Sequence, residues 1–564
     1  MREIRDFSGG WRLYAKSGDE KFSNSAIALP FVCGGEGLCA VTLENEWEAE
    51  DKDAGQTVYL ELSYLCGEAE AFIDGEPAKA FCGGRRAVIT DSADTGKSYK
   101  IKIEIAPLCR ADGRFTVGKI SVTTLGRSHF SMREPGDGVS VKTELAGNEA
   151  VLHIKSLIEN PNNYDIVSFS VSDSAGNTAA AKTAKPTQLD TELILPSPKL
   201  WGGQGDAELY RLQAVLQRDS TMLDSVEISF GIKSAALDSS GLFRLNAVPL
   251  PLNGIEISDC AMIKSDLELF SLCEANAVLA QSLPVKTDLL SECDRSGTVF
   301  WYKAASGGDT GIRALRYFLS KNRHHPSLTA AVCPAMADEK FREGFIKAVR
   351  ECTDGVFTVI ELESGFEGAL PQGFDIALIN VRLQEKDGFM SAVTGGFERL
   401  RSENPGMRFA VSASAAAELS ESAAARLHEL MWNMFFKEKA ITAYFAGLLT
   451  DTPAEKSCHG LVSADRKTPR DAFWFYKSRF SAHNFIKICL PAEKPCKKKL
   501  DIYCYSNVLP LKLLVNKKSK KRYVPVEIYG GSYVFRRVKI KRKNNLIEIS
   551  GADAHDTAEI YYGK

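Results

Sequence analysis

Residues 328–349 read LTAAVCPAMADEKFREGFIKAV, and this stretch combines two patterns that together decide the fold. Its first part, LTAAVCPA, is a short apolar run of the length and composition typical of a buried β-strand. Asp338 and Glu339 then match the N-cap and the acidic first turn of a helix. Four apolar side chains follow at helical spacing and form one face: Phe341, Phe345, Ile346 and Val349. A strand followed by an amphipathic helix is typical of a parallel βα unit.

The surrounding sequence repeats this unit. Seven further strand-like runs lie between residues 236 and 482, most of them separated by helical patterns: LNGIEIS, ANAVLAQS, TVFWYKA, FTVIELE, FDIALINV, RFAVSAS and ITAYFAGLL. Eight units over this length predict a (β/α)8 TIM barrel, whose usual size is about 250 residues. The link SGFEGALPQG between the fifth and sixth runs has no helical pattern, so one unit is expected to be abbreviated.

Short alternating runs separated by Gly, Asp and Ser turns predict β-sandwiches on both sides of the barrel. We expect a jelly-roll, galactose-binding-like domain at residues 1–127 and an immunoglobulin-like sandwich at residues 128–235. The barrel occupies residues 236–482, and a C-terminal β-sandwich follows at residues 483–564. This last segment is basic, with 17 Lys and Arg against 7 Asp and Glu from Pro491 onward.

Composition limits the classes of function. The 564 residues carry a formal net charge of −2, so no general attraction to nucleic acid is expected. The sequence contains no run of 18 apolar residues, so no membrane span is predicted. The 14 cysteines contain no C-x-x-C pair, and the charged N-terminal stretch has no apolar leader. We therefore expect reduced thiols and a cytoplasmic location.

Six motifs follow one another in an informative order. They are PSPKLWGGQGDAELYRLQAVL (196–216), SFGIK (229–233), GLFRLNAVPLPLNGIE (241–256), SDLELFSLCEANAV (265–278), HGLVSADRKTPRDAFWFYKSRFS (459–481) and CYSNVLPLKLLVNKK (504–518). Each resembles a segment of glycoside hydrolase family 2, which holds β-galactosidases, β-glucuronidases and β-mannosidases. The resemblance implies the same order of sandwiches and barrel, and a homo-oligomer.

The resemblance also implies where the chemistry should lie. A retaining glycosidase needs two carboxyl groups about 5 Å apart, and in a barrel they stand at the C-terminal ends of strands. Aligned with the family pattern, the acid/base position is Met336 and the nucleophile position is Ala413. A thioether has no proton to donate and a methyl group cannot attack a sugar, so the catalytic set is predicted to be empty.

Other family contacts to the sugar are replaced as well. The corresponding positions hold small or apolar side chains: Ile257, Ser258, Leu279, Ser282, Ala331 and, near the strand-eight tryptophan, Gly447. We therefore predict a pseudo-glycosidase that binds carbohydrate or an active paralogous glycosidase. A barrel mouth filled by Met336 and Leu279 would favour this hypothesis.

Two alternatives stay open. The chain could be an active glycosidase with relocated carboxylates, for which the candidates are Asp259, Glu363 and Asp451, together with Asp338 and Glu361. Two facing carboxyl groups in an open mouth would favour that alternative. The chain could instead be a purely structural subunit of a glycosidase complex.

The remaining candidates are single residues or short runs. Trp301 could stack on a sugar ring, but a core position is the more common one for an aromatic residue at the end of a barrel strand. His324 and His325 have no third ligand at suitable spacing, so neither a metal nor any other cofactor is predicted. The run KKSKKR (517–522) is read as a solvated strand edge, with an acidic partner as the alternative.

Overall fold

The computed structural model describes residues 2–562 except for short segments at 18–19, 35–37, 64, 66, 82–84, 108–113, 134, 258–262, 281–286, 306, 364, 366–367, 436–440, 452–457, 491–497, 520–522 and 542. The chain divides into two compact units. The first comprises Met1–Ala236, Arg244–Pro249 and Ala280–Val359; the second comprises Leu237–Phe243, Leu250–Leu279 and Ile360–Lys564.

The predicted barrel is confirmed. Its strands form one sheet in the order β31-β30-β29-β28-β27-β26-β33-β32, and β31 also pairs with β32, which closes the barrel. The strands are β26 (Leu252–Ile257), β27 (Ala277–Ala280), β28 (Val299–Lys303), β29 (Leu328–Cys333), β30 (Phe357–Glu363), β31 (Ile376–Leu383), β32 (Arg408–Ala416) and β33 (Ile441–Leu448). The short β34 (Cys458–His459) adds antiparallel to β32.

Helices alternate with these strands as the sequence predicts. They are α1 (Ile263–Cys273), α2 (Thr287–Ser296), α3 (Gly308–Asn322), α4 (Glu339–Cys352), α5 (Phe389–Glu403), α6 (Glu421–Phe435) and α7 (Asp471–Phe480). Asp338 caps α4, because its side chain accepts a hydrogen bond from the Phe341 amide at 2.7 Å. Among the described residues between β30 and β31 there is no helix, in agreement with the abbreviated unit.

The first sandwich belongs to the first unit. A five-stranded sheet, β1-β13-β6-β10-β9, and a six-stranded sheet, β3-β2-β5-β11-β7-β8, enclose a core around Trp11, Leu43 and Ile103. The bounds are β1 (Glu3–Asp6), β2 (Trp11–Ser17), β3 (Glu20–Ile27), β4 (Phe31–Gly34), β5 (Leu38–Glu48), β6 (Thr57–Leu62), β7 (Gly67–Ile73), β8 (Glu76–Pro77), β9 (Ala80–Phe81), β10 (Arg86–Thr90), β11 (Ser98–Pro107), β12 (Arg114–Val117) and β13 (Ile120–Leu125).

The second sandwich packs a three-stranded sheet, β15-β16-β20, against a four-stranded sheet, β19-β18-β21-β22, with Phe169 and Phe230 in its core. Its strands are β14 (His129–Phe130), β15 (Val139–Ala146), β16 (Glu149–Ser156), β17 (Ile158–Glu159), β18 (Asp165–Ser172), β19 (Thr178–Ala184), β20 (Asp190–Pro196), β21 (Tyr210–Arg218) and β22 (Thr221–Phe230). Three short strands then lead to the barrel: β23 (Ala235–Leu237), β24 (Phe243–Leu245) and β25 (Val248–Pro249).

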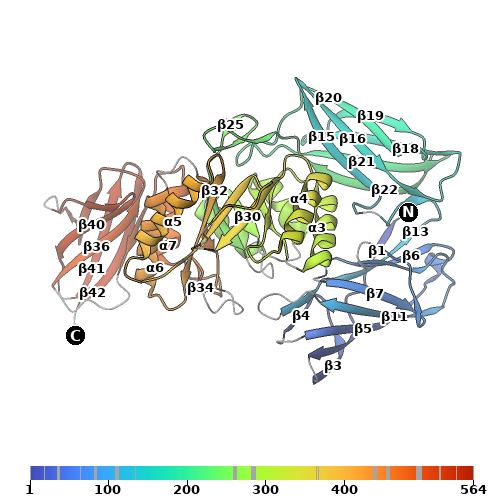
Figure 1. Ribbon diagram of the computed structural model, residues 1–564, viewed down its shortest axis with the longest axis horizontal. Helices are drawn as coiled ribbons and strands as arrows, with labels where there is room; N and C mark the ends of the chain where they lie inside the picture. Colours follow the sequence, from blue (N-terminus) through green and yellow to red (C-terminus); the bar gives the residue numbers. More distant parts are fainter. Residues whose placement is uncertain are drawn as a thin grey trace. The chain divides into compact units, whose positions relative to one another are not determined.

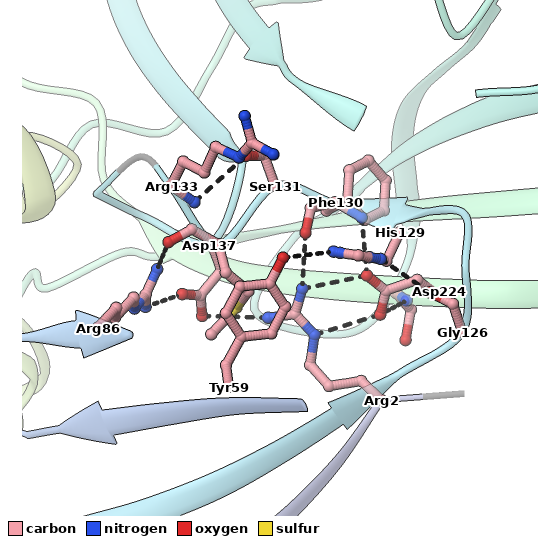
Figure 2. A network of polar contacts seen from close by, with 12 residues as sticks. Arg2, Tyr59, Arg86, Gly126, His129, Phe130, Ser131, Arg133, Asp137 and Asp224 are labelled. Carbon is pink, nitrogen blue, oxygen red and sulfur yellow. Dashed lines mark hydrogen bonds and ion pairs between the residues drawn. The ribbon is translucent and has the colours of Figure 1, made fainter. Parts of the chain in front are cut away.

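A buried ionic network joins these two sandwiches within the first unit (Figure 2). Arg2 lies 3.1 and 3.2 Å from the two carboxylate oxygens of Asp224 on β22 and 3.4 Å from Asp137. Arg86 on β10 binds Asp137 and lies 3.0 Å from Glu61 on β6. The side chain of Asp224 is 0% exposed and that of Arg86 is 2% exposed, so these charges depend on one another.

A neutral histidine completes the same network. His129 Nδ1 lies 2.8 Å from the carbonyl oxygen of Gly126, which can only accept, so Nδ1 carries the proton. Burial lowers the pKa of His129, which leaves Nε2 as an acceptor. The Tyr59 hydroxyl, 3.1 Å away, therefore donates to Nε2, and burial raises the pKa of Tyr59 to about 12.

The C-terminal sandwich belongs to the second unit, as do α5, α6 and α7, which lie beside it in Figure 1. Its sheets are β35-β36-β40-β39 and β38-β37-β41-β42. The bounds are β35 (Ile486–Cys489), β36 (Lys499–Ser506), β37 (Lys512–Val515), β38 (Lys518–Ser519), β39 (Val526–Tyr529), β40 (Ser532–Lys539), β41 (Lys543–Gly551) and β42 (Ala554–Tyr562). None of the helices in the described part of the chain has both the length and the apolar character that a bilayer span requires.

Candidate functional site

The acid/base position of the family falls on Met336, in the turn between β29 and α4. Its side chain is 87% exposed, whereas Leu279 on β27 is 2% exposed. Met336 therefore does not fill a barrel mouth together with Leu279, and this part of the expectation is corrected. An exposed thioether still has no titratable proton, so the chemical argument for this position is unchanged.

At the other catalytic strand, β32, the structure brings two polar side chains together that the sequence did not pair. The Ser412 hydroxyl donates to Glu256 on β26. Strands β26 and β32 are separated in the sheet by β33, so the contact crosses the interior of the barrel. Ser412 is 1% exposed and Glu256 is 2% exposed, so the carboxylate is held by a hydroxyl and shielded from water.

This contact also orients the family nucleophile position. Side chains alternate along a strand, and β32 pairs with β31 without a register shift from Arg408 to Ala415. Ala413 therefore points to the face opposite Ser412, and it is 0% exposed. The inward-facing side chains are the hydroxyls of Ser412 and Ser414. Positions 412–414 hold no carboxyl group, so the chemical argument made from the sequence for Ala413 is unchanged.

At the strand-eight position, Gly447 lies so close to neighbouring atoms of β32 that no side chain fits there. This residue has a φ of +76°, and an ideal Cβ there would lie 2.4 Å from the Ala413 carbonyl oxygen and 2.8 Å from Ser414 Oγ. Only glycine fits such a close approach in a left-handed conformation. The tryptophan that the family resemblance places there has no space in this chain.

Asp451 is the best-placed of the proposed relocated carboxylates, and it is paired. Its two oxygens lie 2.9 and 2.6 Å from the guanidinium of Arg470, and one accepts from the Gly460 amide at 2.8 Å. Burial would raise the pKa of Asp451, but the hydrogen bonds from Arg470 and Gly460 outweigh it and lower the pKa. A carboxylate held ionised by a bidentate arginine is a poor proton donor.

The other relocated candidates lie on different elements of the chain. Glu363 is exposed at the end of β30, and Glu361 on the same strand is 5% exposed. Asp338 is occupied in capping α4. Asp259 lies outside the described residues, as do the replaced positions Ser258 and Ser282. A replacement pair built from these carboxylates stays a prediction.

The aromatic residues of β28 are covered. Trp301 is 1% exposed, and Tyr302 is 7% exposed and stacks on Phe318 with ring centroids 3.8 Å apart. Neither ring has an open face, so a sugar could stack on Trp301 only after the packing around it opened. The position of Trp301 matches the alternative of a core aromatic residue.

The two histidines belong to a buried polar cluster before β29 in the first unit. His325 Nδ1 lies 2.5 Å from Asp294, whose other oxygen accepts from the Ser327 amide at 3.0 Å. Nearby, the ammonium group of Lys233 donates to the Leu328 carbonyl oxygen at 2.7 Å. Burial lowers the pKa of Lys233 to about 7, although the negative charge of Asp294 acts to raise it. These contacts hold the turn that starts β29.

His324 packs on His325 with ring centroids 4.2 Å apart, and burial lowers the pKa of His324 well below its usual range. Within the described ranges, no group of three or more His, Cys, Asp or Glu side chains is arranged to hold a metal ion.

Sequence reasoning missed Glu256, which stands at a position where the resembled family has asparagine. The carboxylate at this position is a further sign in the sequence of a changed barrel interior. The partner, Ser412, lies 156 positions away along the chain, so only the closed barrel reveals the pair. The contact between Ser412 and Glu256 therefore gives this part of the barrel a packed polar interior.

Comparisons with known proteins agree with this architecture. Residues 137–233, within the second sandwich, match the family model for glycosyl hydrolases family 2. A curated β-glucuronidase of Bacteroides fragilis is 21% identical over 436 residues, covering 64% of this chain and 60% of that protein. The match thus spans about three-fifths of the relative's length.

Solved structures share the fold across the whole chain. An FMN-binding β-glucuronidase from Facaelibacterium prausnitzii L2-6 superposes with a TM-score of 0.86 and 19% identity, covering 100% of this chain and 98% of that one. Bacteroides uniformis β-glucuronidase 2, covalently bound to cyclophellitol-6-carboxylate aziridine, superposes with a TM-score of 0.83 and 15% identity. This match covers 100% of this chain and 80% of that one. The solved structures share the fold of the whole chain, and residues 137–233 match the family 2 model. The resemblance to glycoside hydrolase family 2 that was drawn from the motifs is therefore confirmed.

Proposed function

We propose that this protein is a family 2 glycosidase relative that no longer hydrolyses glycosidic bonds and that acts by binding carbohydrate. The observation that carries the proposal is the chemistry at the two catalytic strands. An exposed thioether stands after β29, and hydroxyl and methyl groups stand at 412–414 on β32. Neither group can protonate a leaving oxygen or form a glycosyl ester.

The scaffold around these positions supports a binding role. The fold is shared over 100% of this chain and 98% of the superposed glucuronidase. An active paralogous glycosidase is a candidate partner in this proposal, and a homo-oligomer and a cytoplasmic location remain expectations of it. Light scattering on the purified protein and cell fractionation test the last two.

The rival function is hydrolysis of a β-glucuronide or a related glycoside with relocated carboxylates, since the curated relative is a β-glucuronidase. Its candidates within the described residues are Asp338, Glu361, Glu363 and Asp451. The bidentate contact between Asp451 and Arg470 weighs against it. The third alternative, a purely structural subunit, predicts co-purification with a glycosidase and no sugar binding.

A screen with nitrophenyl glycosides of glucose, galactose, mannose and glucuronic acid tests the proposal. Wild type is compared with a double variant, Glu363→Gln with Asp451→Asn, whose folding is checked by circular dichroism. We expect no turnover by wild type above the buffer rate. Turnover that the double variant loses would establish the rival function.

A flavin is added to the same binding tests because the Facaelibacterium neighbour is an FMN-binding enzyme. No cofactor is proposed for this chain, so FMN absorbance is expected to be unchanged by the protein. A saturable change in flavin absorbance would contradict that part of the proposal.

A further inference from the structure

A cavity of about 590 Å³ opens in the second unit between helices α6 and α7 and one face of the C-terminal sandwich. Figure 1 shows these helices, in orange, beside the red strands of the sandwich. Cavities that hold small organic ligands usually measure about 300–1,000 Å³. No residue of the barrel strands lines it, so this space is separate from the family's catalytic positions.

The floor of the cavity is polar and rigid. The Tyr505 hydroxyl donates to Glu429 at 2.9 Å, and Ser532 lines the same space. Glu429 is 8% exposed, Tyr505 is 5% and Ser532 is 3%. Packing of Tyr505 on Phe475, with ring centroids 5.6 Å apart, fixes α7 against the sheet. The hydrogen bond and the ring contact hold these side chains in place at the floor of the cavity.

One side of the cavity is aromatic and is formed by the outer face of β36. Tyr503 and Tyr505 share one face of β36, since side chains alternate along a strand. The opposite face, with Ile502 and Cys504, belongs to the core of the sandwich. Tyr503 is 47% exposed, so its ring is an open surface at the rim. Two more tyrosines, Tyr529 and Tyr533, line the same space.

The charged lining selects the ligand by its charge. Four carboxyl side chains line the cavity, Glu385, Glu429, Asp471 and Asp501, against one guanidinium, Arg426. Burial raises the pKa of Glu429 and of Asp471, so the negative charge of the lining lies mainly on Glu385 and Asp501. Phosphates and uronic acids would meet this excess of carboxyl groups. The positive charge of Arg426 repels a cationic ligand, and its N–H groups can only donate hydrogen bonds. A neutral molecule with many hydroxyl groups can donate to the carboxylates and accept from Arg426.

The apolar and polar parts of the lining therefore fit one ligand chemistry. The C–H face of a sugar ring packs on tyrosine, and its hydroxyl groups bind carboxylates and guanidinium. A neighbouring cavity of about 370 Å³ shares Glu385, Ala423 and Arg426 with the first, so Arg426 stands between spaces for two rings.

We propose that this cavity is a binding site for a neutral saccharide of one or two rings, with Tyr503 as the stacking surface and Glu429, Asp501 and Arg426 as hydrogen-bonding partners. The inference rests on the proposed carbohydrate-binding role, to which it adds a place and a ligand class. It assigns the binding to the joint between α6, α7 and the C-terminal sandwich.

Calorimetric titration of the full chain with neutral methyl glycosides and disaccharides tests the inference. Glucuronic acid, spermidine and FMN are titrated in parallel. The variants are Tyr503→Ala and a matched control, Tyr561→Ala, whose tyrosine is 46% exposed on the same sandwich but outside the cavity lining. We expect neutral saccharides to bind, with a loss of about tenfold or more in Tyr503→Ala and less than about twofold in Tyr561→Ala.

Saccharide binding that Tyr503→Ala leaves unchanged would overturn this inference while leaving the proposed function in place. Tighter binding of glucuronic acid, spermidine or FMN than of any neutral saccharide would also overturn it. If the nitrophenyl glycosides are turned over and saccharide binding is also weakened by Tyr503→Ala, only the proposed loss of hydrolysis is contradicted.

Discussion

Glu429→Gln is expected to make the protein more stable at pH 8 and to change little at pH 5. Burial raises the pKa of Glu429 to about 7, in part offset by the hydrogen bond from Tyr505. The ordinary value is 4.5, so between pH 4.5 and 7 the folded chain retains a proton that the unfolded chain releases. Stability conferred by this proton is present at low pH and is lost as pH rises through 7.

The magnitude follows from the pKa difference. At about 1.36 kcal/mol for each pH unit, ionising Glu429 in the folded state costs roughly 3 kcal/mol at pH 8. The amide introduced by the substitution keeps an acceptor oxygen for Tyr505 and carries no charge. Its NH2 group needs a partner in return, which reduces the gain by about 1 kcal/mol. We therefore expect the variant to be about 2 kcal/mol more stable than wild type at pH 8.

Hydrogen exchange of peptides from α6 and β36, followed by mass spectrometry at pH 5, 6, 7 and 8, measures the opening free energy near this site. Other titrating groups are the same in both proteins, so the difference between them isolates Glu429. The difference should grow steadily from pH 5 to pH 8. An equal difference at all four pH values would refute the reasoning.

Three further substitutions test other parts of the structure. Asp224→Asn removes the charge that binds buried Arg2 and should cost about 3–5 kcal/mol, seen as a lower Tm of the first unit; an unchanged Tm would contradict the network. Between pH 7 and 10.5 the unfolded wild-type chain binds a proton at Lys233 that the folded chain does not, because the folded pKa is about 7 and the ordinary value is 10.5, so stability should rise with pH. Lys233→Met should abolish this rise. Equal pH profiles of the stability of wild type and variant would count against it. Gly447→Ala should lower stability by at least about 2 kcal/mol through strain and overpacking. The control Gly395→Ala, in a helix with no atom within 4 Å of an added Cβ, should be neutral or stabilising by up to about 1 kcal/mol; similar Tm values for the two would refute the close approach.

The barrel could be predicted because its units are local. The apolar run 328–333 and the helical face after Asp338 lie within one stretch of chain, and the structure contains both as β29 and α4. Even the N-cap could be anticipated, since Asp338 bonds an amide only three residues away. Short-range periodicity and capping carry this information.

The interior of the site could not be predicted in the same way. The contact between Ser412 and Glu256 joins residues 156 positions apart, and it alone shows that Ala413 points away from it. The burial of Trp301 likewise depends on packing that no local pattern encodes. The cavity around Glu429 combines two helices with a sandwich that begins more than 50 residues later. These features require the assembled domains.

Covalent trapping tests the central claim most directly. Cyclophellitol aziridines react with the nucleophilic carboxylate of a retaining glycosidase, and Bacteroides uniformis β-glucuronidase 2 is seen covalently bound to one such compound. The protein is incubated with gluco-, galacto-, manno- and glucurono-configured aziridines, and its intact mass is measured. The account predicts an unmodified mass with every compound, because residues 412–414 on β32 hold no carboxyl group. One equivalent of adduct, mapped by peptide analysis to a barrel carboxylate such as Glu256, Glu361 or Asp451, would contradict it.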